Sequence, residues 1–136
     1  MTHLLPRTIE IDITADHLRD ALAAALETIV AAAQGDEMVA ERGSLSLPFK
    51  GEGRDVPELL IDLTASLLEA MEGQREAVSA ITVAGVLTTE RGYSGWGFAT
   101  VARGTPVVLR AVDLSAPILV YRHGQQIEIN TTAVIG

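Results

Sequence analysis

The sequence predicts an α+β fold in which two helices pack on antiparallel β-sheet, in the order β-α-β-α-β-β-β-β-β. Three observations favour this class. Residues 7–14 alternate between apolar and polar side chains, residues 52–73 form a helix with both ends marked, and the C-terminal half carries short strand-like segments between turns rich in glycine and proline. Residues 1–136 contain no linker or repeat and are predicted to form a single domain.

The first predicted elements are a strand over 7–14 and a helix over 17–34. In the strand, Ile9, Ile11 and Ile13 share one face. Asp16 is the predicted N-cap of the helix and Gly35 its stop. The helix carries an apolar stripe at spacings of three and four residues, which predicts one buried face. The stripe consists of Leu18, Ala21, Leu22, Ala25, Leu26, Ile29, Val30 and Ala33.

A predicted loop over 35–43 leads to a second strand over 44–49. Its apolar side chains, Leu45, Leu47 and Phe49, alternate with polar residues and Pro48. Proline cannot donate a backbone hydrogen bond, so this segment is predicted to be an edge strand or a strand end.

The helix over 52–73 is predicted to be the centre of the core. Asp55 is its N-cap, Pro57 is tolerated in the first turn, Glu58 occupies the position of a capping-box acid, and Gly73 is the left-handed stop. Its apolar stripe covers more of the helix circumference than a helix with one solvent-facing side would carry. Its residues are Leu59, Leu60, Leu63, Leu67 and Met71, with Ile61 and Leu68 widening the stripe.

Five further strands are predicted after this helix, and their short connections imply antiparallel pairing. They cover residues 78–89, 93–103, 106–113, 117–122 and 126–134. Arg91–Phe98, which includes the turn before the second of them and its first residues, has a superficial likeness to an RNA-binding strand with stacking aromatics. The favoured interpretation is a hairpin strand whose Trp96 and Phe98 cover the core helix.

The charge balance argues against a nucleic-acid-binding protein. The net charge is −8, and residues 1–76 hold 15 acidic residues against 6 Lys or Arg, whereas binding to phosphate needs clustered cations. The chain has no cysteine, which excludes disulfides and thiolate chemistry. It has no apolar run of membrane-spanning length and no signal-peptide segment at its start, so a cytoplasmic protein without a membrane partner is expected.

Two features could carry site chemistry. His3, His17 and His123 are predicted to be structural or solvated, since no two of them stand at the spacing of helical metal ligands. Asp12 and Asp16 flank a strand-to-helix junction and could hold Ca²⁺ or Mg²⁺. In the competing interpretation, Asp12 is a solvated strand residue and Asp16 a helix cap.

The order of elements resembles the archease family. The residues that carry the resemblance are Asp16-His17-Leu18-Arg19-Asp20 at a helix start, the stretch Lys50–Asp55, and the helix that begins Glu58-Leu59-Leu60-Ile61-Asp62-Leu63. Archeases are small cytoplasmic accessory proteins with an α+β fold and an acidic metal site, and they assist the GTP-dependent tRNA-splicing RNA ligase. The resemblance therefore implies a protein partner, with that RNA ligase as the candidate.

When the predicted elements are matched to those of the family, the positions of the family's metal ligands hold other residues in this chain. The family motif Asp-His-Thr-Ala-Asp falls on Leu4–Thr8, a C-terminal ligand stretch falls near Leu114–Ala116, and a last aspartate falls near Asn130-Thr131. We therefore expect a non-enzymatic, archease-like accessory protein that binds a protein partner, without metal, other cofactor or direct contact to nucleic acid. The identity of the partner and the oligomeric state stay open.

The alternative is a metal-dependent activator of the RNA ligase with relocated ligands. Those ligands would be Asp12, Asp16, Glu128 or Asn130, holding Ca²⁺ or Mg²⁺. Two weaker alternatives are an enzyme whose site has no sequence signature and a homo-oligomeric or small-molecule-binding module.

Overall fold

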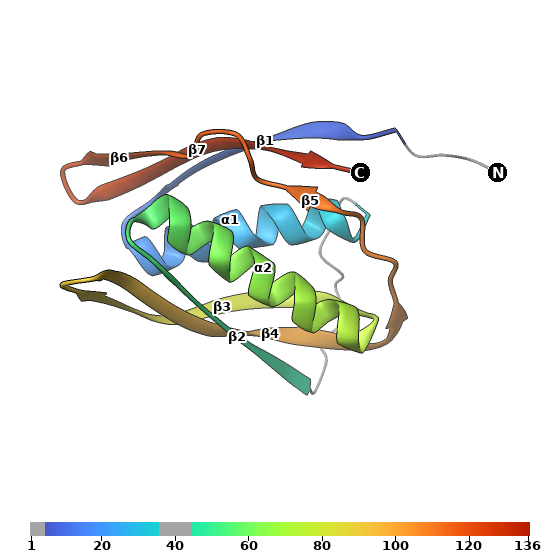
Figure 1. The fold of residues 1–136 in the computed structure, drawn as a ribbon. Helices are drawn as coiled ribbons and strands as arrows, with labels where there is room; N and C mark the ends of the chain where they lie inside the picture. The colour runs from blue at the N-terminus through green and yellow to red at the C-terminus, as the bar shows by residue number, and fades with distance from the viewer. Residues whose placement is uncertain (1–4, 36–44) are drawn as a thin grey trace.

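The computed structural model describes residues 5–35 and 45–136 and has three layers, with two helices between two antiparallel sheets (Figure 1). The α+β class and the predicted order of elements are confirmed. The predictions for His3, Leu4, Ser44 and the loop after Gly35 lie outside the described residues. The elements are β1 (Arg7–Ala15), α1 (Leu18–Ala33), β2 (Leu45–Gly53), α2 (Val56–Gln74), β3 (Glu76–Thr89), β4 (Gly92–Pro106), β5 (Val112–Asp113), β6 (Leu119–His123) and β7 (Gln126–Ile135).

The strands form two sheets, which we name sheet A and sheet B. In sheet A, β7 pairs with β1 on one side and with both β5 and β6 on the other. In sheet B, β4 lies between β2 and β3. Every pairing is antiparallel. The short connections predicted this for the strands that follow α2. Each sheet therefore buries one face against the helices and leaves its outer face uncovered by them.

The core lies in the helical layer, and α2 is central to it. Its five predicted core residues, Leu59 to Met71, are each 0% exposed. The predicted widening of the stripe is wrong at Ile61, which is 44% exposed. In the described ranges no helix is long and apolar enough to cross a membrane.

The start of α1 differs from the prediction. The helix begins at Leu18 and its N-cap is His17, with an extended backbone and no side-chain cap bond. Asp16 is therefore one residue too early to cap the helix, and the predicted capping role is wrong. The chain leaves β1 at Ala15 and needs both intervening residues to turn into the helix. At the other end Gly35 adopts a positive φ of 109°, consistent with the predicted stop.

The N-terminus of α2 is as predicted, and its C-terminus is not. The Asp55 carboxylate accepts from the Glu58 N–H at 2.9 Å, which confirms the N-cap. The left-handed residue at the C-terminus is Arg75 with φ 61°, not Gly73, and the Arg75 N–H donates to the Met71 carbonyl at 2.9 Å. Gly73 therefore lies inside the helix, which continues to Gln74.

Helix α2 also caps the free edge of β2. The backbone N–H groups of Arg54, Glu52 and Lys50 donate to Glu58, Asp62 and Ser66 at 2.8, 2.7 and 3.4 Å. These acceptors are four residues apart and the donors two apart, so the spacings match: four helical residues advance about 6 Å and two strand residues about 6.6 Å. The prediction that Pro48 marks an edge strand is confirmed, and α2 satisfies donors that an edge would otherwise expose.

Glycines allow this close approach. A Cβ at Gly51 would lie 2.8 Å from the Leu63 backbone nitrogen, and one at Gly53 would lie 2.3 Å from the Leu59 nitrogen. Gly95 and Gly97 of β4 also face the helical layer and are buried. Helix α2 thus packs on a glycine-lined inner face.

The predicted orientation of Trp96 and Phe98 is consequently wrong. Because side chains alternate along a strand, burying Gly95 and Gly97 turns both aromatic residues to the outer face. Trp96 is 41% and Phe98 40% exposed. At Gly95 the space is filled by the Leu59 and Leu63 side chains of α2, and at Gly97 by the Thr82 carbonyl oxygen of β3 and the Phe49 ring.

The predicted strand over 106–113 is mostly irregular, and only Val112–Asp113 forms β5. Residues between β4 and β5 instead bond to the ends of both helices. The Val107 N–H donates to the Arg75 carbonyl at 3.1 Å, and the Arg110 N–H donates to the Ala33 carbonyl at 2.9 Å. This segment therefore satisfies helix carbonyls that have no intrahelical partner.

Candidate functional site

Three of the four candidate metal ligands come together on the outer face of sheet A. Asp12 of β1 lies directly opposite Asn130 of β7, and Thr14 lies opposite Glu128. Directly opposed residues of antiparallel strands share a face, with Cβ atoms about 5 Å apart. The pairing of the first strand with the last thus brings residues from the two ends of the chain together.

His123 joins this group and was missed as a site residue. Its Nε2 lies 3.2 Å from Oε1 of Glu128, while the Asn130 side chain donates to the other Glu128 oxygen at 3.1 Å. The Tyr121 ring stacks on His123 with centroids 6.2 Å apart. The sequence signal was the turn at Gly124, which sets the β6–β7 register and places Tyr121 opposite Glu128.

The chemistry that this cluster offers is limited by its own hydrogen bonds. Both oxygens of Glu128 are engaged, so within the cluster Asp12 alone presents a carboxylate without a bond. Across residues 5–35 and 45–136, no group of three or more His, Asp or Glu side chains is placed to hold a metal ion. A Ca²⁺ site takes six to eight oxygen ligands, so the cluster would need further ligands from water or a partner.

A hollow of about 460 Å³ lies beside the cluster, lined by Asp12 and Asn130. Ala116 and Thr131, two positions that the archease resemblance aligns with metal ligands, line the same hollow. The Thr131 hydroxyl donates to the Pro117 carbonyl at 3.0 Å. These aligned positions therefore meet in space, but they supply a methyl group and an already bonded hydroxyl where the family has acids. Thr8 lies elsewhere on β1, opposite Val134.

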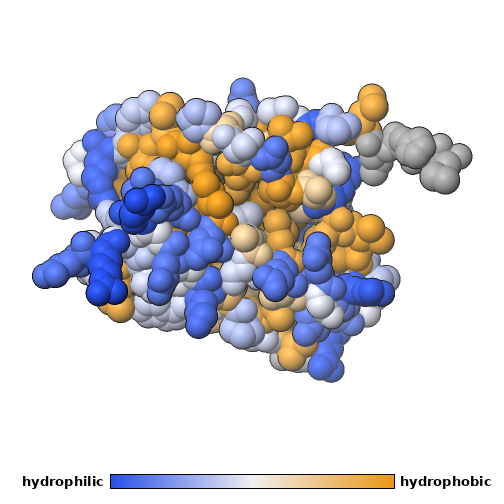
Figure 2. All heavy atoms as spheres, viewed as in Figure 1, coloured by the Kyte–Doolittle hydropathy of each residue, from blue (hydrophilic) through white to orange (hydrophobic). Residues whose placement is uncertain are grey.

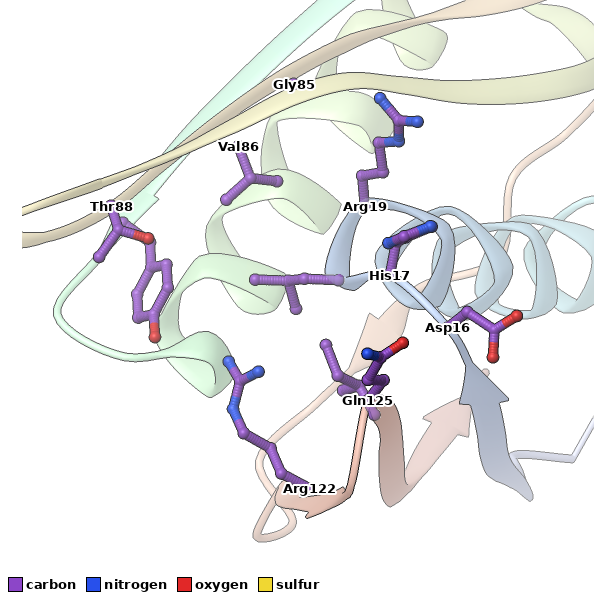
Figure 3. A pocket seen from close by; sticks show the side chains of 11 residues that line it. Asp16, His17, Arg19, Gly85, Val86, Thr88, Arg122 and Gln125 are labelled. Atoms are coloured by element: carbon purple, nitrogen blue, oxygen red, sulfur yellow. The ribbon is translucent and has the colours of Figure 1, made fainter.

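Asp16 does not join the other candidates. It follows the end of β1 and lines a different cavity, of about 540 Å³, which opens between the two sheets beside the first turn of α1 (Figure 3). His17 and Arg19 lie on the same wall, and Arg122 lies on the wall formed by the β6–β7 hairpin. Asp12 and Asp16, which were considered as possible ligands of one metal ion, therefore line different cavities.

The outer face of sheet B forms a second candidate surface. We use this name for the side chains of sheet B that point away from the helices. They include Pro48 and Lys50 of β2, Thr82 and Leu87 of β3, and Trp96 and Phe98 of β4. Leu87 is 56% exposed, so three large apolar side chains stand on two adjacent strands. On the side of the molecule seen in Figure 2, hydrophobic residues gather in the upper half and at the right of the view, and hydrophilic residues prevail at the lower left.

The chain matches no protein-family model and none of the curated proteins compared with it. The resemblance to archeases therefore stays a prediction.

Proposed function

We propose that this protein is a non-enzymatic, archease-like accessory protein that binds a protein partner through the outer face of sheet B. The GTP-dependent tRNA-splicing RNA ligase is the candidate partner, on the strength of the sequence resemblance. The observation that carries the proposal is the exposure of Trp96, Phe98 and Leu87 on a sheet face that no other element of the described chain covers.

Exposed apolar side chains on a sheet face need a reason, because antiparallel sheets usually turn polar residues to solvent. Trp96 has a partial structural reason: a Cβ at Gly85 would lie 2.4 Å from its ring, so the indole covers the Gly85 backbone. Phe98 and Leu87 have no such role. Contiguous exposed apolar surface is typical of protein–protein contact sites, and aromatic residues are enriched there.

The charges of this face favour a protein partner over RNA. Lys50 and Glu52 alternate along β2 with opposite signs, so this region is close to neutral in a chain of net charge −8. An RNA backbone would be repelled by the whole chain and would gain few phosphate contacts. Binding of an apolar protein surface to the same face would cost little free energy for the desolvation of charged groups.

We expect Leu87→Glu to abolish binding of the partner, because it places a charge among the apolar side chains of the proposed contact. The purified RNA ligase of the same organism is titrated with the wild-type protein and with each variant, and the dissociation constant is measured by biolayer interferometry. Leu119→Glu is the matched control: Leu119 is 50% exposed on the outer face of sheet A. A loss of at least tenfold corresponds to about 1.4 kcal/mol of binding free energy.

Affinity capture from native cells extends this test beyond the ligase. A protein that wild type and Leu119→Glu capture and that Leu87→Glu fails to capture would support the proposed face. Equal capture by all three baits would contradict it. Salt-dependent binding of tRNA that Leu87→Glu and Phe98→Ala weaken would instead make the face an RNA surface.

The alternative function, a metal-dependent activator of the ligase, is favoured by the meeting of Asp12 with Asn130. Under this alternative Asp12, Glu128 and Asn130 would contribute ligands for Ca²⁺ or Mg²⁺, and the partner or water would complete the shell. Asp16, which lies at the other cavity, would play no part.

We expect millimolar Ca²⁺ or Mg²⁺ to leave the melting temperature unchanged if the non-metal proposal holds. An ion that binds only the native state must raise the melting temperature once it exceeds its Kd. Thermal melts of wild type, Asp12→Asn and Asp16→Asn distinguish the two functions. A rise of several degrees that Asp12→Asn removes and Asp16→Asn preserves would establish the relocated site and displace the first proposal.

A further inference from the structure

Strand β1 is the outermost strand of sheet A. It pairs with β7 on one side, and no described element pairs with its other side. In a strand paired on one side only, alternate residues direct their backbone N–H and C=O groups away from the sheet. The register of β1 with β7 is unbroken, and residues 8–15 contain neither proline nor glycine. Strand β1 is therefore a regular template to which a further strand could pair.

The other sheet edges in the described chain are covered, irregular or short. Helix α2 accepts hydrogen bonds from the backbone of β2. The pairing of β3 with β4 is interrupted by register shifts, and the Gln34 side chain of α1 bonds to the Val78 N–H at 3.0 Å and to the Val78 carbonyl at 2.8 Å. On the other side of β7, β5 has two residues and β6 has five. Covering, bulges and shortness protect an edge from pairing with another chain, and β1 lacks all three among the described residues.

The outer face of β1 is acidic. Glu10 and Asp12 are exposed there, two residues apart along the strand. Glu128 of the neighbouring β7 adds a third carboxylate to this face, and β7 contains no Lys or Arg. The inner face of β1 is apolar, and its Ile9 and Ile13 are only partly buried.

These charges determine which kind of strand can pair with β1. Two fully overlapping copies of β1 would set the carboxylates of Glu10 and Asp12 opposite each other, and like charges directly opposite are destabilising. A segment with Lys or Arg at alternate positions would instead place a cation opposite each carboxylate. Because side chains alternate along a strand, its intervening side chains would lie on the inner side, beside Ile9 and Ile13. A second copy is thus disfavoured, and a segment of alternating basic and apolar residues is favoured.

The hollow of about 460 Å³ on this face also suits a long cationic side chain. Glu10 and Asp12 line it together with Pro117 and Leu119. Lys and Arg bury their aliphatic stems along apolar surface and keep the charged end in a polar environment. The hollow offers both kinds of surface next to each other.

We propose that β1 pairs with an extended segment of a partner protein in which Lys or Arg alternates with apolar residues. The backbone of the segment would bond to the open edge of β1, and its cations would face Glu10 and Asp12. Its apolar side chains would extend the inner face of sheet A. This edge is separate from the outer face of sheet B, so the inference goes beyond the proposed function and is tested independently of it.

Three blocked peptides test the edge. The first is Ser-Val-Lys-Val-Lys-Val-Ser, the second carries glutamate in place of both lysines, and the third, Ser-Lys-Lys-Val-Val-Val-Ser, has the composition of the first without its alternation. Binding to the whole protein is measured by isothermal titration calorimetry, at low salt to limit screening. We expect the alternating lysine peptide to bind at least tenfold more tightly than either of the others. Amide hydrogen exchange should then slow in β1 and stay unchanged in β3.

The double variant Glu10→Lys/Asp12→Lys should reverse the preference, so that the glutamate peptide binds more tightly than the lysine peptide. Glu52→Lys/Glu90→Lys is the matched control, because it changes the net charge equally at exposed positions outside sheet A. It should keep the preference of wild type. Melting curves without peptide verify that both variants fold, and the three peptides on wild type decide the matter even where a variant does not.

Three results would overturn the proposal. One is failure of the alternating lysine peptide to bind wild type at millimolar concentration. Another is equally tight binding of the peptide without alternation. The third is a preference that the control variant reverses as fully as Glu10→Lys/Asp12→Lys does, because the attraction would then come from the net charge and not from β1.

Discussion

Replacing Leu67 by alanine is expected to lower the free energy of unfolding by about 2–5 kcal/mol. Leu67 is 0% exposed and belongs to a core cluster that includes residues of α1 and of both sheets. Truncation removes buried methyl and methylene groups and leaves a cavity, because close-packed neighbours relax only partly. The loss should be this large because α2 contacts the other layers from the centre of the molecule.

Urea unfolding of wild type and variant measures this loss, with Ile61→Ala as the control on the same helix. Ile61 is 44% exposed, so its truncation removes less buried surface and should cost below about 1 kcal/mol. If Leu67→Ala unfolded within about 0.5 kcal/mol of wild type, the central position of α2 in the core would be wrong.

The sequence was sufficient for the elements whose periodicity is strong. The alternation of apolar residues in β1 and their three-to-four-residue spacing in α2 each predict one buried face, because the spacing of apolar residues along the sequence determines which side chains share a face. Trp96 and Phe98 show where this reasoning fails. Their strand alternates large and small residues, and the larger ones are ordinarily assigned to the core. The inner face instead belongs to Gly95 and Gly97: a Cβ at Gly95 would contact the Leu59 and Leu63 side chains of α2, and one at Gly97 would overlap the Thr82 carbonyl oxygen of β3.

The candidate ligands show a second limit. Asp12, Glu128 and Asn130 were identified as residue types, but their meeting depends on the pairing of β1 with β7, a contact between the two ends of the chain. Local patterns do not contain such a pairing. The same holds for His123, whose contact with Glu128 depends on the register of the β6–β7 hairpin. The prediction that Asp16 caps α1 was wrong for a local reason, because the helix begins one residue later than predicted.

Replacing Gly53 by alanine is expected to cost about 3 kcal/mol, at the upper end of the usual penalty for overpacking. The added Cβ would lie 2.3 Å from the Leu59 nitrogen and 2.7 Å from the Glu58 carbonyl carbon. Both are backbone atoms of the first turns of α2, so no side-chain rotation relieves the overlap. The helix would have to move away from β2, which would also lengthen the hydrogen bonds that Glu58 and Asp62 accept from the strand.

Gly73→Ala is the matched control, since it makes the same chemical change inside α2. A Cβ at Gly73 meets nothing within 4 Å, and alanine is favoured over glycine in a helix, so this variant should gain about 0.5–1 kcal/mol. Urea unfolding of the two variants should therefore give shifts of opposite sign. Amide hydrogen exchange should locate the damage in Gly53→Ala, with faster exchange at the Glu52 and Arg54 N–H groups. Equal stability of both variants would mean that α2 does not contact the β2 backbone through its glycines.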